Sequence, residues 1–112
     1  MKRFTLAVGA LIASFAASAS DGNDLYKWAL DYKKDNNAPS EAFYAGRYTG
    51  YISGINEAFA NQFICLPVNT RNRQLFDIVY MRLRDNPKER TDDAGLIVLR
   101  ALSEAYPCKN NK

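Results

Sequence analysis

The stretch EAFYAGRYTGYISGINEAFANQF, residues 41–63, decides the fold of this chain. Its large apolar residues recur at steps of four, three, four and four, the spacing of one face of an α-helix. That face consists of Tyr44, Tyr48, Tyr51, Ile55 and Phe59. The pattern predicts one long helix from about Glu41 to about Phe63, with Ser40 as its N-cap.

A ridge of small residues runs along the same predicted helix. Gly46, Gly50 and Gly54 lie four apart, and each glycine inside a helix costs roughly 1 kcal/mol relative to alanine. A phosphate-binding loop spaces its glycines unevenly between a strand and a helix, and a transmembrane dimer needs an uncharged segment. Since this segment carries Arg47 and Glu57, the ridge is predicted to be a helix-packing surface, against which a neighbouring backbone lies close in a soluble helical domain.

Three further helices are predicted around the long one. Helical spacing of apolar residues indicates helices over residues 25–34, around residues 75–83 and around residues 94–105. Pro87 and Pro107 follow the last two and stop them. No segment has the pattern of a strand, so the predicted fold class is all-α, a small domain of four helices, or five, with one disulfide.

The chain begins with the pattern of a secretory signal peptide. Lys2 and Arg3 precede an apolar run that ends in small residues up to Ala19. Serines interrupt the run before it reaches the roughly 20 apolar residues of a membrane span. We therefore expect residues 1–19 to be a cleaved signal peptide and residues 20–112 to be a periplasmic helical domain without membrane attachment. Cleavage after Ser18 and an uncleaved anchor are the alternatives.

Charge and residue content argue against several classes of function. The chain has 15 Lys and Arg and 12 Asp and Glu, and two of the cations leave with the signal peptide, so 13 − 12 gives +1. We expect no nucleic-acid partner from so small a charge. The sequence has no histidine, which removes the commonest general base and zinc ligand. We expect no enzyme, no catalytic residue, no cofactor and no metal site.

The two cysteines, Cys65 and Cys108, both lie in the exported part. An even pair in an exported chain is more often a disulfide than a metal or redox site. Their separation is 108 − 65 = 43 residues. On the chain-entropy account, closing a loop of that length stabilises by roughly 4 kcal/mol.

Three segments resemble the Rap/Tai-type immunity family of bacterial type VI secretion systems. They are YTGYISGINEAF at residues 48–59, CLPVNTRNRQLFDIVYMRLRDNP at residues 65–87, and LIVLRALSEAYPC at residues 96–108. The resemblance implies a small periplasmic all-α protein, often a homodimer, that binds and blocks a cognate peptidoglycan amidase toxin. It also implies a Cys65–Cys108 bond.

The chain departs from the family pattern at two places. Many members carry a second cysteine pair, and the positions that match it here hold Tyr48 and a residue near Trp28. The segment 69–71, Asn-Thr-Arg, replaces the usual Gly-Val-Thr. These departures concern the turn geometry and the choice of toxin.

Inhibition by such a chain is expected to be occlusion, in which a loop on a rigid scaffold fills the toxin's cleft and a few residues supply most of the energy. Two loops are candidates, residues 85–93 and residues 66–73. Their candidate partner-binding residues are Lys88, Glu89, Arg90 and Asp92 in the first, and Arg71 and Arg73 in the second. The alternative for both loops is a solvated connection.

Two further alternatives stay open at this point. The abundant aromatic residues serve either the core or a protein interface, since interfaces are rich in Tyr, Trp and Arg. The protein could also be a small periplasmic stress chaperone or another helical binding protein. Without histidine, such a chaperone would have to respond to acid through carboxylates that titrate near pH 4.

Overall fold

A computed structural model describes residues 19–34 and 38–109. They form four α-helices and one short 3-10 helix: α2 (Gly22–Tyr32), α3 (Pro39–Phe59), α4 (Asn72–Asp85), η3 (Pro87–Thr91) and α5 (Ala94–Ala105). Within these residues the only extended pairings are two isolated bridges, so the predicted all-α fold with four helices is confirmed. The predicted signal peptide, residues 1–19, lies outside the described residues except for Ala19.

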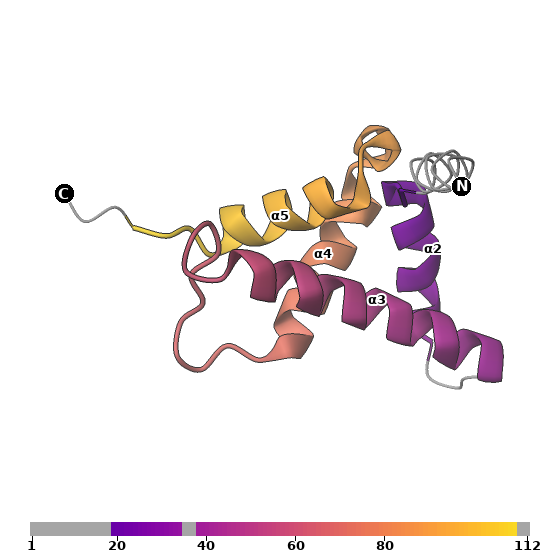
Figure 1. The fold of residues 1–112 in the computed structure, drawn as a ribbon. Coiled ribbons are helices and arrows are strands. Elements are labelled where there is room, and N and C mark those ends of the chain that lie inside the picture. Colours follow the sequence, from indigo (N-terminus) through magenta and orange to yellow (C-terminus); the bar gives the residue numbers. More distant parts are fainter. Residues whose placement is uncertain (1–18, 35–37, 110–112) are drawn as a thin grey trace, which may run out of the picture.

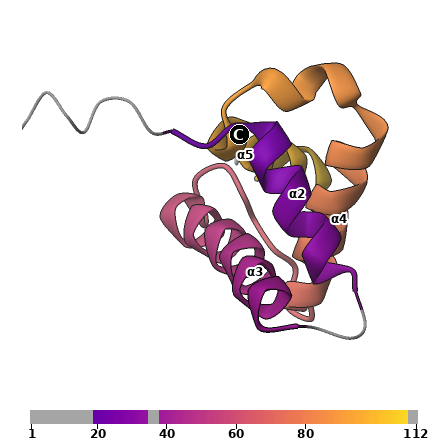
Figure 2. The ribbon, with the colours of Figure 1, turned by 90° about the vertical axis from the view of Figure 1, so that its right-hand side faces the viewer.

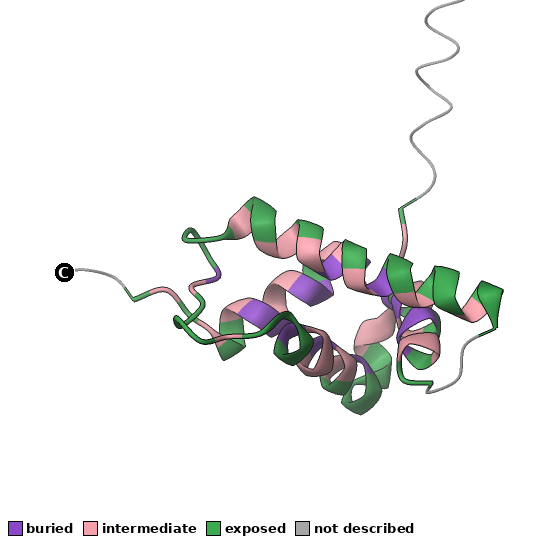
Figure 3. Ribbon diagram, turned by 90° about the horizontal axis from the view of Figure 1, so that it is seen from below, coloured by how far each residue is buried: buried purple, intermediate pink, exposed green. Residues whose placement is uncertain are grey.

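The helices enclose one apolar core. α3 is the longest helix and runs along one side, with α2 set steeply against it and α5 alongside its C-terminal half (Figures 1 and 2). α4 packs mainly against α5. The inward sides of all four helices are buried (Figure 3). The buried core consists of Leu25, Trp28, Ala29, Tyr48, Ile52, Ile64, Leu75, Val79, Leu83, Ala94, Ile97, Val98, Ala101 and Leu102.

The start and the end of α3 both differ from the prediction. The N-cap is Ala38 and Pro39 is the first helical residue, because proline's fixed φ suits that position and its missing N–H is not needed there. Ser40 is therefore inside the helix, and its predicted role as N-cap is wrong. The helix ends at Phe59 rather than near Phe63, since Asn61 adopts a left-handed φ of 66° and turns the chain.

The core face of α3 centres on Tyr48 and Ile52, which are both fully buried. The hydroxyl of Tyr48 donates a hydrogen bond of 2.6 Å to the carbonyl oxygen of Phe76 in α4. The ring of Tyr48 also lies 5.2 Å from that of Tyr32 in α2. Aromatic contacts therefore join α2 to α3, and the core interpretation of the abundant aromatic residues is confirmed for Tyr48.

The N-terminus of α2 is fastened to the junction between η3 and α5. Asp21 and Asp24 form a capping box, with hydrogen bonds of 2.9 and 3.2 Å between each carboxylate and the other's backbone N–H. The N–H of Gly22 donates to the Asp92 carbonyl at 2.9 Å. A Cβ at Gly22 would stand 2.7 Å from the Cα of Arg90, so only glycine fits this close approach.

The predicted disulfide between Cys65 and Cys108 is present, with a Cα–Cα distance of 4.9 Å. It joins the segment after α3 to the segment after α5. The backbone N–H of Cys65 also donates to the Tyr106 carbonyl at 2.9 Å. Among the described helices, none combines the length and the apolar character needed to cross a membrane.

Candidate partner-binding surfaces

The connection between α4 and α5, residues 86–93, is held by a network of ion pairs. Arg82 in α4 donates two hydrogen bonds to Glu89, of 2.8 and 2.9 Å, and a third of 2.7 Å to Glu104. Arg100 in α5 contacts Glu89 at 3.2 Å and Asp92 at 2.8 Å. These contacts give η3 a fixed position against both helices.

The network changes the acidity of its members. Hydrogen bonds from Arg82 hold the pKa of Glu89 below its usual value, against the opposing effect of partial burial. The pKa of Arg82 is raised, chiefly by its hydrogen bond to Glu89. The pKa of Arg100 is raised chiefly by its hydrogen bond to Asp92. Each of these shifts favours the charged form of Glu89, Arg82 and Arg100.

Arg90 also makes its contacts inside the chain. Its Nε donates to the Leu83 carbonyl at 2.7 Å and its Nη2 to the Arg84 carbonyl at 3.1 Å. Its guanidinium lies 3.9 Å from the ring centroid of Tyr26 in α2. Arg90 therefore satisfies carbonyls at the C-terminal end of α4 and joins that end to α2, and its substitution would disturb the fold.

Three of the four residues predicted to bind a partner from this connection are thus engaged in intramolecular contacts. Glu89 is 16% exposed at its side chain, whereas Lys88 is exposed and forms no salt bridge within the described part of the chain. The sequence reveals the charges here but not their partners, which come from other helices. A partner-binding role for these residues stays a prediction.

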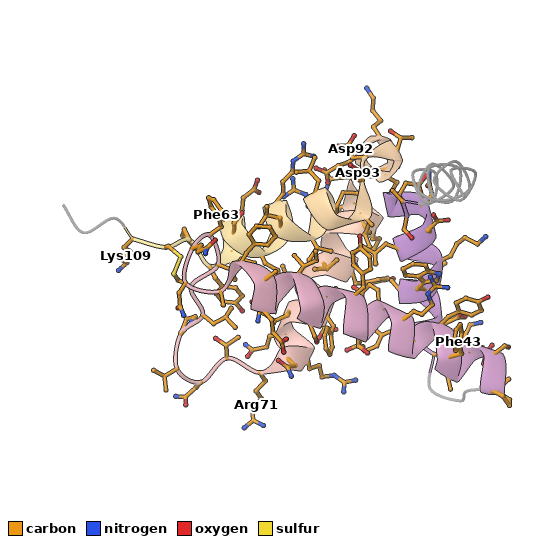
Figure 4. All side chains as sticks on the ribbon, viewed as in Figure 1. Phe43, Phe63, Arg71, Asp92, Asp93 and Lys109 are labelled. Carbon is orange, nitrogen blue, oxygen red and sulfur yellow. A yellow bond between two sulfur atoms is a disulfide. The ribbon has the colours of Figure 1, made fainter. Side chains whose placement is uncertain are left out.

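The connection between α3 and α4, residues 60–71, is different, and we call it the disulfide loop. Three large apolar side chains face solvent: Val68 is 97% exposed, Phe63 is 55% exposed and Leu66 is 36% exposed. Its tip is a turn in which the N–H of Thr70 donates to the Pro67 carbonyl at 3.1 Å. Figure 4 shows the loop projecting from the end of the bundle, with Arg71 pointing outward.

Positive charge flanks this apolar tip. Arg71 and Arg73 are both exposed, and neither forms a salt bridge in the described residues. No acidic residue occurs between Glu57 and Asp77. Both arginines are among the residues predicted to bind a partner, whereas the apolar residues of the tip are not. A signal for them is present in the sequence, because Leu66 and Val68 flank Pro67 and belong to no helical stripe.

The glycine ridge of α3 faces solvent. Gly46, Gly50 and Gly54 are exposed, and a Cβ built on any of them would meet no atom within 4 Å. Tyr48 and Ile52, on the opposite side of the helix, are buried in the core. The predicted close approach of a neighbouring backbone is therefore wrong within the described residues of this chain, and three exposed helical glycines cost roughly 1 kcal/mol each.

Aromatic and charged side chains lie on the same outer side of α3. Phe43 is 60% exposed at the N-terminal end of the helix. The guanidinium of Arg47 lies 4.5 Å from the Trp28 ring centroid and 6.0 Å from that of Phe43. In the residues covered by the structure, no group of three His, Cys, Asp or Glu side chains is placed to hold a metal ion.

Comparison with known families assigns the chain to a class of protein. A family model described as Rap1a immunity proteins matches residues 21–108, which include all four α-helices and both cysteines. The chain therefore belongs to the Rap1a immunity protein family, and the resemblance found in the sequence is confirmed. The comparison with curated proteins gives no match.

Proposed function

We propose that this protein is a periplasmic immunity protein that inhibits a type VI secreted peptidoglycan amidase by occluding its active site. Family membership supports an immunity role, which is the binding of a cognate toxin rather than catalysis. The observation that carries the proposal is the disulfide loop, because its apolar tip is exposed on a rigid bundle and is covalently fastened at its base.

The disulfide loop fits this role better than the connection at residues 86–93. A loop that fills a cleft gains affinity from apolar side chains that become buried on binding, and from being held in place beforehand. Val68, Leu66 and Phe63 are exposed before binding and so are available for burial. Apart from Lys88, the charged residues of η3 and the adjoining Asp92 already have intramolecular partners, and exchanging those partners for toxin contacts would gain little.

Arg71 and Arg73 give the loop a preference for one kind of cleft. Two exposed arginines that form no salt bridge in the described residues would pair with acidic groups at the rim of the toxin's active site. The proposed toxin surface is thus an apolar cleft with an acidic rim. An amidase cleft that binds a peptide-linked sugar polymer is one surface of this kind.

We also propose that the protein is a homodimer through the outer side of α3. Exposed glycines let two helix backbones approach closely, which would recover the stability that they cost in the isolated chain. An antiparallel pair of α3 helices that sets Gly50 opposite Gly54 of the second copy also sets Arg47 opposite Glu57. The same residues then meet in both directions, as a two-fold interface requires.

The test of the proposed function is survival of a susceptible bacterium. Candidate amidase toxins are secreted into its periplasm with and without this chain, exported by its own leader. The expected result is that co-expression of this chain rescues the bacterium from one of the toxins, and that the chain and this toxin co-purify. If the chain is stable in the periplasm but rescues from no amidase toxin, and instead prevents aggregation of many unfolded proteins, the chaperone alternative replaces the immunity proposal.

A further inference from the structure

The first residues of the disulfide loop are fastened to the end of α3, because the N–H groups of Gln62, Phe63 and Ile64 donate to the Phe59 carbonyl at 3.1, 3.1 and 3.2 Å. At its start, Ile64 is buried in the core, and the N–H of Asn61 donates to the Ile64 carbonyl at 2.8 Å. At its end, Leu75 is buried in the first part of α4. Between them, the hydrogen bonds found for residues 66–71 stay within the loop or reach only as far as Gln74.

Cys65 is the last fixed residue before the exposed tip. Its sulfur is bonded to Cys108 and its N–H to the Tyr106 carbonyl. Cys108 lies two residues beyond Tyr106, the C-cap of α5, whose own N–H donates to the Leu102 carbonyl at 2.8 Å, so the bond fastens the loop to the segment that directly follows α5. Without it, the bond of 2.9 Å from the Cys65 N–H to the Tyr106 carbonyl would be the one backbone hydrogen bond found between these two segments in the described residues.

The helical core, in contrast, is built without the cysteines. Its buried residues come from α2, α3, α4 and α5, together with Ile64, and neither cysteine is among them. Both cysteines are partly exposed, so a thiol or a disulfide of another molecule can approach them. The state of the bond therefore acts on the loop and the tail more directly than on the helices.

We propose that the Cys65–Cys108 disulfide is a redox gate for the disulfide loop, so that the chain presents its toxin-binding tip only after oxidation. This inference rests on the proposed function and adds its regulation. In the reduced chain the loop samples many conformations, and binding must then order it at a cost in free energy. In the oxidised chain that ordering is already done.

The chemistry is a thiol–disulfide exchange with a protein disulfide, the class of oxidant that exported proteins meet. One thiolate attacks the oxidant's disulfide and forms a mixed disulfide, and the second thiolate then displaces the oxidant. The two cysteines lose two protons and two electrons, and the oxidant leaves as a dithiol. A newly made chain in a reducing compartment would lack the disulfide, so its loop would not be ordered for binding and a toxin stored in that compartment would stay unbound.

Limited proteolysis of the exported full chain tests the gate without any toxin. Trypsin cleaves after Arg71 and Arg73 in or next to the loop, and after Lys88 in the connection that ion pairs hold. Mass spectrometry follows each site in the oxidised chain, in the chain reduced with a phosphine, and in the Cys65→Ser/Cys108→Ser variant. All are compared at a temperature where circular dichroism shows native helix content in the reduced chain.

The expected result is cleavage after Arg71 and Arg73 that is about tenfold faster without the disulfide, since local opening becomes easier there, while cleavage after Lys88 is unchanged. The double variant should not respond to the reductant. Equal rates at every site would overturn the gate. Loss of helix content at all temperatures, with faster cleavage everywhere, would also overturn it and make the bond a staple of the whole fold.

A second arm measures binding to the amidase toxin that passes the rescue test. The oxidised chain should bind at least about tenfold more tightly than the double variant, as expected when binding must order a loop. Equal affinities would overturn the gate even if the loop is looser. If no toxin passes the rescue test, the proposed function fails, whereas proteolysis still decides whether the disulfide orders the loop.

Discussion

Arg82 in α4 forms a two-pronged hydrogen bond with Glu89 in η3, with Nε–Oε1 at 2.8 Å and Nη2–Oε2 at 2.9 Å. Both side chains are mostly shielded, at 22% and 16% exposure. Charged, bidentate pairs of this kind are stronger than neutral hydrogen bonds. This pair fixes the short connection on which four of the predicted partner-binding residues lie.

Replacing Glu89 by glutamine should lower the free energy of unfolding by about 1–2 kcal/mol at neutral pH. The glutamine amide is uncharged and has one acceptor oxygen, so it cannot accept both hydrogen bonds that Arg82 donates to the carboxylate. Urea unfolding followed by circular dichroism measures the difference. Asp85→Asn is the matched control, since Asp85 is exposed and its salt bridge is to its sequence neighbour Arg84. A loss as large for the control would show that the position of the charge does not matter.

The effect of Glu89 should depend on pH in a defined direction. Its pKa in the folded protein is below the unfolded value, which is about 4.3 for a free glutamate. The carboxylate therefore stabilises the fold above that pH, and the stabilisation is lost as the pH falls through the folded-state pKa. Unfolding curves for the wild type and Glu89→Gln should approach each other in acid; a gap that stays constant would contradict the ion-pair explanation.

Val68→Asp should weaken toxin binding by at least about tenfold, because it puts a charge on the apolar tip that the cleft is proposed to bury. Arg71→Ala combined with Arg73→Ala should mainly slow association and reduce its salt dependence. Binding kinetics with the toxin found by rescue measure both effects. Lys88→Ala is the control from the other connection. If Lys88→Ala weakens binding more than Val68→Asp does, the connection at residues 86–93 and not the disulfide loop is the main toxin-binding segment.

Tyr48→Phe should cost about 0.5–1.5 kcal/mol of stability, the usual net value of one hydrogen bond, because it removes the bond to the Phe76 carbonyl. Burial also raises the pKa of the Tyr48 hydroxyl well above its usual value. Its contribution is thus fully present below pH of about 10 and declines as the pH rises further. Ultraviolet titration of the folded protein should show this tyrosine ionising last, and its ionisation with the others would refute the burial.

Gly50→Ala should stabilise the isolated chain by roughly 0.5–1 kcal/mol, because alanine favours the helix and its Cβ meets open space. The same substitution should weaken the proposed homodimer, since each added methyl separates the paired backbones. Sedimentation and thermal unfolding over a range of concentrations distinguish the two effects. An unchanged dimer in Gly50→Ala would remove α3 from the interface.

Gly22→Ala, by comparison, should destabilise the folded chain by about 1–3 kcal/mol, because the added Cβ would be overpacked against Arg90.

The sequence by itself determined that four α-helices form and where α4 and α5 end. Apolar periodicity predicted the four helices, because residues that share a helical face recur every three or four positions whatever the tertiary fold. Pro87 and Pro107 marked stops for the same local reason. The two cysteines and the ordered family motifs predicted the disulfide and the immunity class, since both depend on residue identity and order along the chain.

Only the tertiary structure decided which surfaces are free. The periodicity placed Gly46, Gly50 and Gly54 on one ridge, but the packing of α3 against its neighbours turned that ridge toward solvent. From the sequence, the charged residues near Glu89 are expected to be free to bind a partner. In the fold, Arg82 of α4 and Arg100 of α5 pair with Glu89 instead. The ridge and the ion pairs depend on residues far apart in the chain, and such long-range relations have no local signal in the sequence. The apolar tip is different, because Leu66 and Val68 lie beside a proline and outside any helical stripe, and the structure shows that both are exposed.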